Sequence, residues 1–173
     1  METLTRIKSV IDKIVQWLCI VVLAVMTVLV TYQVVTRYFF NKPSGWSEIT
    51  AQYLFVWAVM FGSALVFGER GHLEITTIKG KLPPTPLMIV EILTNILLVA
   101  FAIAVLSYGG YKISMSQMNV VDASLQIPMG WIYFSIPVHG VIMAFYGLYN
   151  CMLAVKEWKE NKHPLTDNTA GTM

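Results

Sequence analysis

The chain has 173 residues, of which 56% are hydrophobic and 13% are charged, and its formal net charge is +2 at pH 7. An average soluble domain carries roughly 25% charged residues, about twice this fraction. The composition therefore excludes an ordinary soluble domain and indicates one small domain embedded in a lipid bilayer. The basic residues form no dense patch, so we expect no nucleic-acid partner.

Four apolar runs fill most of the sequence, and none has an Asp, Glu, Lys or Arg in its middle. A helix needs about 20 mostly apolar residues to cross roughly 30 Å of hydrocarbon. We therefore predict an all-α integral membrane protein with four transmembrane helices in one bundle. The predicted spans are 14–36, 49–67, 87–110 and 129–155. They form a four-helix transmembrane domain over residues 1–163, and residues 164–173 form a flexible cytoplasmic tail.

Lys and Arg are distributed unevenly between the loops. Nine of them lie before the first run, between the second and third, or after the fourth, and three lie in the other two loops. Because positive residues concentrate on the cytoplasmic side, we predict both termini inside and loops 37–48 and 111–128 outside. The first run is longer than a signal-peptide core and no A-x-A site follows it, so we expect a retained helix.

The two hairpin connections differ in character. In loop 37–48, Pro43-Ser-Gly interrupts the apolar pattern and predicts a tight outer turn. Ser44 or Ser47 is in place to cap the second helix, and Glu48 suits the positive end of its dipole. In loop 68–86, apolar residues recur among polar ones, which predicts a short amphipathic segment at the inner membrane surface. A solvated linker is the alternative for that segment.

The sequence offers no catalytic, cofactor-binding or metal-binding set of residues. Cys19 and Cys151 stand outside any pair motif, and we expect free thiols that serve as small packing groups. Glu91 lies just inside the third run, where Asn95, one turn later, is placed to hydrogen-bond it. His139 is the one titratable group near the membrane centre, and a histidine bonded to a neighbouring helix is favoured over a proton relay. We therefore expect neither an enzyme nor a protein that couples ions to transport by itself.

Two sets of residues predict close helix contacts. The second run has aromatic residues at steps of four, and the fourth run has small residues on one face, which lets two helix backbones approach closely. Packing within the bundle and contact with a second membrane protein are both open. The two sets are Tyr53, Trp57 and Phe61, and Gly140, Ala144 and Gly147.

Several stretches, taken in order, resemble a known family. They are Arg37-Tyr-Phe-Phe-Asn-Lys-Pro-Ser-Gly-Trp-Ser-Glu48, then Tyr53-Leu-Phe-Val-Trp57, Gly62 and Gly71-His72-Leu-Glu-Ile, and finally the stretch from Leu125 to Pro137. The pattern is similar to the small membrane subunit (DctQ-like) of tripartite ATP-independent periplasmic (TRAP) transporters. One departure is Ile49, where the family often has a second acidic residue after Glu48.

The resemblance implies a small permease subunit in the bacterial inner membrane. It would brace a large, elevator-type membrane subunit and help a periplasmic substrate-binding protein to dock, with uptake driven by sodium. The substrate would be an organic acid, with sialic acid ahead of a C4-dicarboxylate. The aromatic and small-residue sets would contact the large subunit. Arg37 and Glu48 would form an ion pair that fixes the outer hairpin. The alternative is that the Arg37 side chain extends to a lipid phosphate. The residues assigned to docking of the binding protein are Lys42, Trp46, Lys112 and Trp131. A stand-alone oligomeric four-helix channel or exporter, and a non-transport membrane adaptor, are the alternatives.

Overall fold

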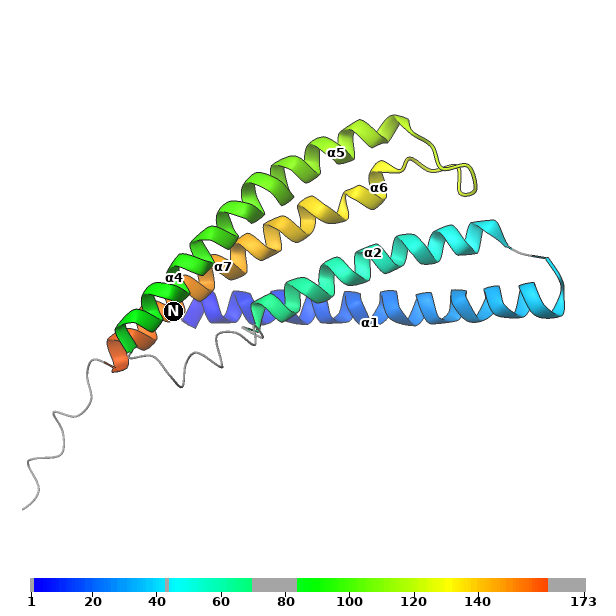
Figure 1. The fold of residues 1–173 in the computed structure, drawn as a ribbon. Coiled ribbons are helices and arrows are strands. Elements are labelled where there is room, and N and C mark those ends of the chain that lie inside the picture. The colour runs from blue at the N-terminus through cyan, green and yellow to red at the C-terminus, as the bar shows by residue number, and fades with distance from the viewer. Residues whose placement is uncertain (1, 43, 70–83, 162–173) are drawn as a thin grey trace, which may run out of the picture.

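The structure is a computed structural model that describes residues 2–42, 44–69 and 84–161. Its described part consists of helices joined by short connections. In chain order these are α1 (Glu2–Phe39), α2 (Gly45–Gly68), α4 (Pro84–Phe101), the π-helical η1 (Ala102–Gly109), α5 (Gly110–Ser116), the 3-10 helix η2 (Gln117–Asn119), α6 (Gly130–Tyr133) and α7 (Ser135–Asn161). The elements from α4 to η2 follow one another without a break and form one long rod (Figure 1).

Within the described residues, four helical stretches are long and apolar enough to cross a membrane, in agreement with the predicted number of spans. They are Leu4–Phe39, Gly45–Gly68, Ile89–Asn119 and Gly130–Lys156. The inside position of both termini stays a prediction. The centre of the predicted amphipathic segment and the whole of the predicted tail lie outside the described residues.

The connection between α1 and α2 ends one helix sharply and starts the next. Asn41 adopts the left-handed backbone region, with φ of 49°, which Asn tolerates better than most residues. The Lys42 N–H donates to the Thr36 carbonyl at 3.1 Å and so closes the end of α1. Ser44 occupies the N-cap position of α2, although its hydroxyl caps no backbone N–H. The chain thus reverses within a few residues, as the Pro43-Ser-Gly sequence predicts.

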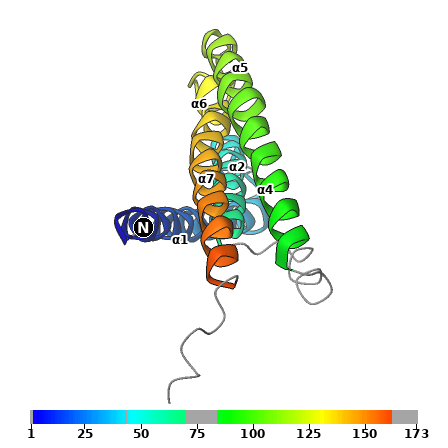
Figure 2. The ribbon, with the colours of Figure 1, turned by 90° about the vertical axis from the view of Figure 1, so that its left-hand side faces the viewer.

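The four long helices lie in the order α1, α2, α7, α4. α2 packs between α1 and α7, and α7 packs between α2 and the rod of α4 and η1. Both views show α1 at a wide angle to α4 and α7 (Figures 1 and 2). In the described part of the chain, α1 packs mainly along α2 and contacts α7 near the end that holds the N-terminus, and its opposite face is uncovered. The predicted bundle is therefore open on the sides of α1 and α4.

All four long helices meet at the end that holds the N-terminus, as Figure 1 shows. Ala64 and Phe67 of α2 and Tyr146 of α7 form the buried core of this end. Ile11 of α1 and Leu98 of α4 pack against that core. Following the charge distribution we call this the inner end, and we call the end with the α1–α2 turn the outer end.

Candidate subunit interfaces and polar anchors

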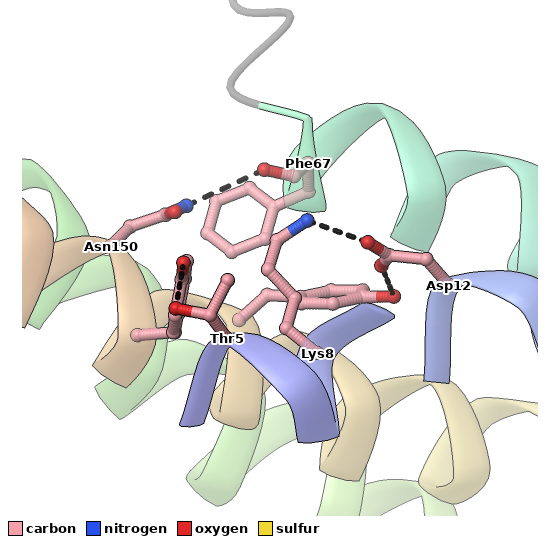
Figure 3. Close-up of polar contacts among 7 residues, drawn as sticks. Thr5, Lys8, Asp12, Phe67 and Asn150 are labelled. Atoms are coloured by element: carbon pink, nitrogen blue, oxygen red, sulfur yellow. Dashed lines mark hydrogen bonds and ion pairs between the residues drawn. The ribbon is translucent and has the colours of Figure 1, made fainter. Parts of the chain in front are cut away.

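A cluster of polar side chains ties α1 to α7 at the inner end (Figure 3). The Tyr146 hydroxyl donates to Asp12 Oδ1 at 2.6 Å, and Tyr146 itself is fully buried. Lys8 Nζ lies 2.7 Å from Asp12 Oδ2 and 5.5 Å from the centroid of the Tyr146 ring. Asp12 therefore joins a cation on its own helix to a hydroxyl on α7, and the three groups satisfy one another's charge and hydrogen bonding.

Two further contacts close the inner end. Asn150 Nδ2 donates to the Phe67 carbonyl at 3.5 Å, which links α7 to the end of α2. The hydroxyls of Thr5 and Tyr149 lie 3.4 Å apart, between α1 and α7. A Cβ on Gly68 would lie 2.9 Å from ring atoms of Tyr146, so this position needs a glycine for the ring to pack. The cluster fixes how three helices meet, which is a structural role rather than a chemical one.

The sequence interpretation missed these anchors. Lys8 and Asp12 stand four residues apart before the first apolar run, a spacing that predicts a pair on one helix face. Nothing in the sequence connects Asp12 with Tyr146, because 134 residues separate them.

The aromatic residues of α2 turn toward the inside of the chain. Phe61 is 6% exposed, and Tyr53 and Trp57 are half-buried. The rings of Trp57 and Phe61 lie 5.4 Å apart in a tilted arrangement. Phe61 therefore offers little surface to a second protein, whereas Tyr53 and Trp57 keep part of theirs.

The small residues of α7 pack within the chain. A Cβ on Gly140 would lie 2.8 Å from the backbone nitrogen of Ser107 in η1, and a Cβ on Gly147 would overlap the Val99 side chain in α4. Both glycines are buried and Ala144 is half-buried. Of the two possibilities that the sequence leaves open, the structure favours packing within the chain for the glycines.

The residues assigned to binding-protein docking all lie toward the outer end and are exposed. Lys42 and Trp46 flank the α1–α2 turn, and the Trp46 ring lies 5.9 Å from that of Tyr32. Lys112 stands on α5 with its Nζ 5.1 Å from the centroid of the Tyr108 ring. Trp131 lies in α6, directly after the 120–129 connection. The two outer connections approach each other, because the Cβ position of Gly45 lies 3.6 Å from Ser124 Oγ.

Asp122 organises the 120–129 connection, a role that the sequence interpretation missed. Its Oδ1 accepts the N–H groups of Ser124 at 2.8 Å and Leu125 at 2.9 Å. The pKa of Asp122 is lowered, and the largest cause is the hydrogen bond from the Leu125 N–H. Burial of the carboxylate raises the pKa in the opposite direction, whereas the Ser124 N–H and the nearby Tyr53 hydroxyl lower it further. The sequence pattern that could have predicted this role is an Asp followed two residues later by Ser, which is typical of an Asx turn.

Arg37 and Glu48 line the same cavity at the outer turn. No ion pair joins these two side chains to each other in the described part of the chain. The predicted hairpin pair is therefore not formed directly.

His139 forms the bond to a neighbouring helix that the sequence favours. Its Nδ1 lies 2.8 Å from the Met60 carbonyl of α2, and since a carbonyl only accepts, Nδ1 carries the proton.

Asn95 donates to the backbone carbonyl of Glu91 at 2.8 Å, and both residues are buried. Cys19 and Cys151 form no disulfide bond with each other. In the described ranges no three His, Cys, Asp or Glu residues gather in a way that could hold a metal ion.

Comparison with known proteins decides the family. A profile described as "Tripartite ATP-independent periplasmic transporters, DctQ component" matches residues 26–157. The chain belongs to this family of small TRAP permease components. A TRAP transporter small permease protein of Haemophilus influenzae is 30% identical over 134 residues, which cover 78% of this chain and 83% of that protein.

Two further relatives carry a substrate in their names. The sialic acid TRAP transporter small permease protein SiaQ of Vibrio cholerae is 28% identical over 142 residues, which cover 82% of each chain. The sialic acid TRAP transporter permease protein SiaT of Haemophilus influenzae is 27% identical over 139 residues, which cover 78% of this chain and 22% of that protein. This small permease is thus a multi-pass protein of the bacterial inner membrane and a transporter subunit, not an enzyme.

Proposed function

We propose that this small permease braces a large, elevator-type membrane subunit and helps a periplasmic substrate-binding protein to dock during sodium-coupled uptake of an organic acid. One observation carries the proposal: in the described spans no Asp, Glu, Lys or Arg lies in the middle of a helix. Ionisable residues at that depth mark ion paths and proton relays, because they are costly and are kept for a use. The coupling ion therefore belongs on a different subunit.

The open arrangement of the helices supports the bracing role. The outer faces of α1 and α4 carry large exposed apolar side chains along most of their length. In a membrane, such apolar faces contact either lipid acyl chains or another membrane protein. Trp57 marks where a protein is expected, since its indole N–H has no acceptor among the described residues and hydrocarbon supplies none. A backbone carbonyl of the large subunit would satisfy it.

The outer end supports the docking role. Two lysines and two tryptophans are exposed there, on or near two connections that approach each other. Aromatic residues are enriched where proteins bind one another. The residues are Lys42, Trp46, Lys112 and Trp131. Docking steered by two lysines should weaken as salt rises. The names of two relatives make sialic acid the first substrate to test, with C4-dicarboxylates next.

Co-purification from the native membrane tests the bracing role. The tagged wild-type chain should bring down one large membrane protein in equal amount. Trp57→Ala should lower its recovery severalfold, because tryptophans at interface centres contribute about 2 kcal/mol or more. Phe55→Ala is the matched control on the same helix, since Phe55 is 56% exposed and has no polar group that needs a partner.

Two outcomes count against the proposal in different ways. Normal recovery with Trp57→Ala would remove this residue from the interface. Recovery of the wild-type chain as a homo-oligomer without a large partner would contradict the bracing role itself.

A further inference from the structure

A small cavity lies between α1 and α2 at the outer end of the molecule. Its volume is about 230 Å³. Pockets for drug-sized ligands usually span roughly 300–1,000 Å³, so this cavity suits a smaller chemical group. The lining residues are Gln33, Val34, Arg37, Tyr38, Ser44 and Glu48.

Polar groups in this lining have no partner within the described chain. Gln33 Nε2 and Ser44 Oγ are buried and form no hydrogen bond with any described residue. Arg37 and Glu48 line the same space without pairing with each other. A buried polar group left without a partner costs about 1–3 kcal/mol. The cavity lining thus combines two buried polar atoms that lack a partner with two exposed side chains of opposite charge. This combination indicates a ligand that accepts hydrogen bonds and carries both a negative and a positive charge.

The position of the cavity along the helices indicates where that ligand comes from. Arg37 lies in the last turn of α1 and Glu48 in the first turn of α2, each directly beyond an apolar run. Tyr38 and Trp46 are exposed at the same level, as aromatic residues are at a membrane interface. The cavity therefore lies at the depth of lipid headgroups.

We propose that this cavity binds the headgroup of a zwitterionic phospholipid with a primary amine, of the phosphatidylethanolamine type. The Arg37 guanidinium holds the phosphate in a two-point contact, and the start of α2 adds the positive end of its dipole. Gln33 donates to a phosphate or ester oxygen. Glu48 accepts the ammonium, which an anionic headgroup such as phosphatidylglycerol lacks.

This assignment explains how the outer hairpin is held without a direct ion pair. The lipid bridges Arg37 to Glu48, so that the two charges act through its phosphate and its amine. The proposal does not rest on a large subunit or a binding protein, because the whole cavity belongs to this chain.

Lipid retention by the full chain tests the proposal. The chain is reconstituted in nanodiscs with equal amounts of phosphatidylethanolamine and phosphatidylglycerol, extracted into mild detergent, and examined by native mass spectrometry. The wild type should retain one phosphatidylethanolamine about tenfold over phosphatidylglycerol, since one charge-assisted contact corresponds to roughly that ratio. Arg37→Gln should retain neither lipid, and Glu48→Gln should lose the preference. Lys42→Gln, which removes a charge from the same turn outside the cavity lining, should behave as the wild type does.

Three results would overturn the proposal. They are equal retention of the two lipids by the wild type, an unchanged preference with Glu48→Gln, and displacement of the lipid by free phosphoethanolamine at equal concentration. The last result would identify a water-soluble ligand instead of a lipid. If Arg37→Gln fails to fold by circular dichroism, Glu48→Gln decides alone, because it keeps the size and shape of the side chain.

Discussion

Replacing Gly140 by Ala tests whether the contact between α7 and η1 determines the packing of this chain. The added methyl would lie 2.8 Å from both the Ser107 nitrogen and Leu106 Cβ. Carbon atoms in good contact are about 3.5–4.0 Å apart, so the two helices must separate by roughly an ångström. Ser107 cannot simply turn away, since its Oγ donates to the Ala102 carbonyl at 2.9 Å. Overpacking of this kind costs about 1–3 kcal/mol.

Gly62→Ala is the matched control, because a Cβ at Gly62 meets nothing within 4 Å. Alanine is the better helix former by about 0.8–1.0 kcal/mol, so this variant should be as stable as the wild type or slightly more stable. The gain in helix propensity is common to both variants, so their free energies of unfolding should differ by the overpacking cost of about 1–3 kcal/mol. The assay is unfolding of the full chain in mixed micelles, followed by circular dichroism. If Gly140→Ala proves as stable as Gly62→Ala, our description of this helix contact is wrong.

Two further variants test the polar contacts. Tyr146→Phe removes the hydroxyl that binds Asp12 and should lower the free energy of unfolding by about 0.5–2 kcal/mol in the same assay, and an unchanged value would mean that α1 is held by apolar packing alone. Asp122→Ala should destabilise the outer connection more than Asp122→Asn, which keeps an acceptor for the Ser124 N–H. Because the pKa of Asp122 is lowered from 3.8, its stabilising charge is fully present above about pH 4 and is lost as the pH falls through the folded-state pKa. The stability difference between the wild type and Asp122→Ala, measured from pH 7 to pH 3, should therefore shrink below about pH 4, and a difference that grows on acidification would contradict the assignment.

The helices themselves could be predicted from the sequence because one physical requirement dominates. Hydrocarbon accepts only long apolar segments with internally bonded backbones, so each span is visible in a single window of residues. His139 was predictable for the same reason: a polar group at that depth must find a partner. The identity of the partner was not predictable, since Met60 contributes a backbone carbonyl, which carries no sequence signature.

Contacts between distant segments could not be predicted. Asp12 and Tyr146 meet only because α1 and α7 converge, and local periodicity does not report on that convergence. The π-helical stretch around Ser107 was also hidden, because its sequence is as apolar as that of an ordinary helix. The aromatic and small-residue sets were recognised as contact surfaces. Whether such a surface meets the same chain or another one depends on the arrangement of all four helices.

The central claim is that this chain supplies shape and contact area within the membrane while another subunit moves the solute and its coupling ion. Vesicles that contain this chain alone, with a sodium gradient and an organic acid such as sialic acid outside, test it most directly. We predict no accumulation of solute above that of protein-free vesicles, and accumulation only when the large subunit and the binding protein are added. Gradient-driven accumulation by this chain alone would contradict the account.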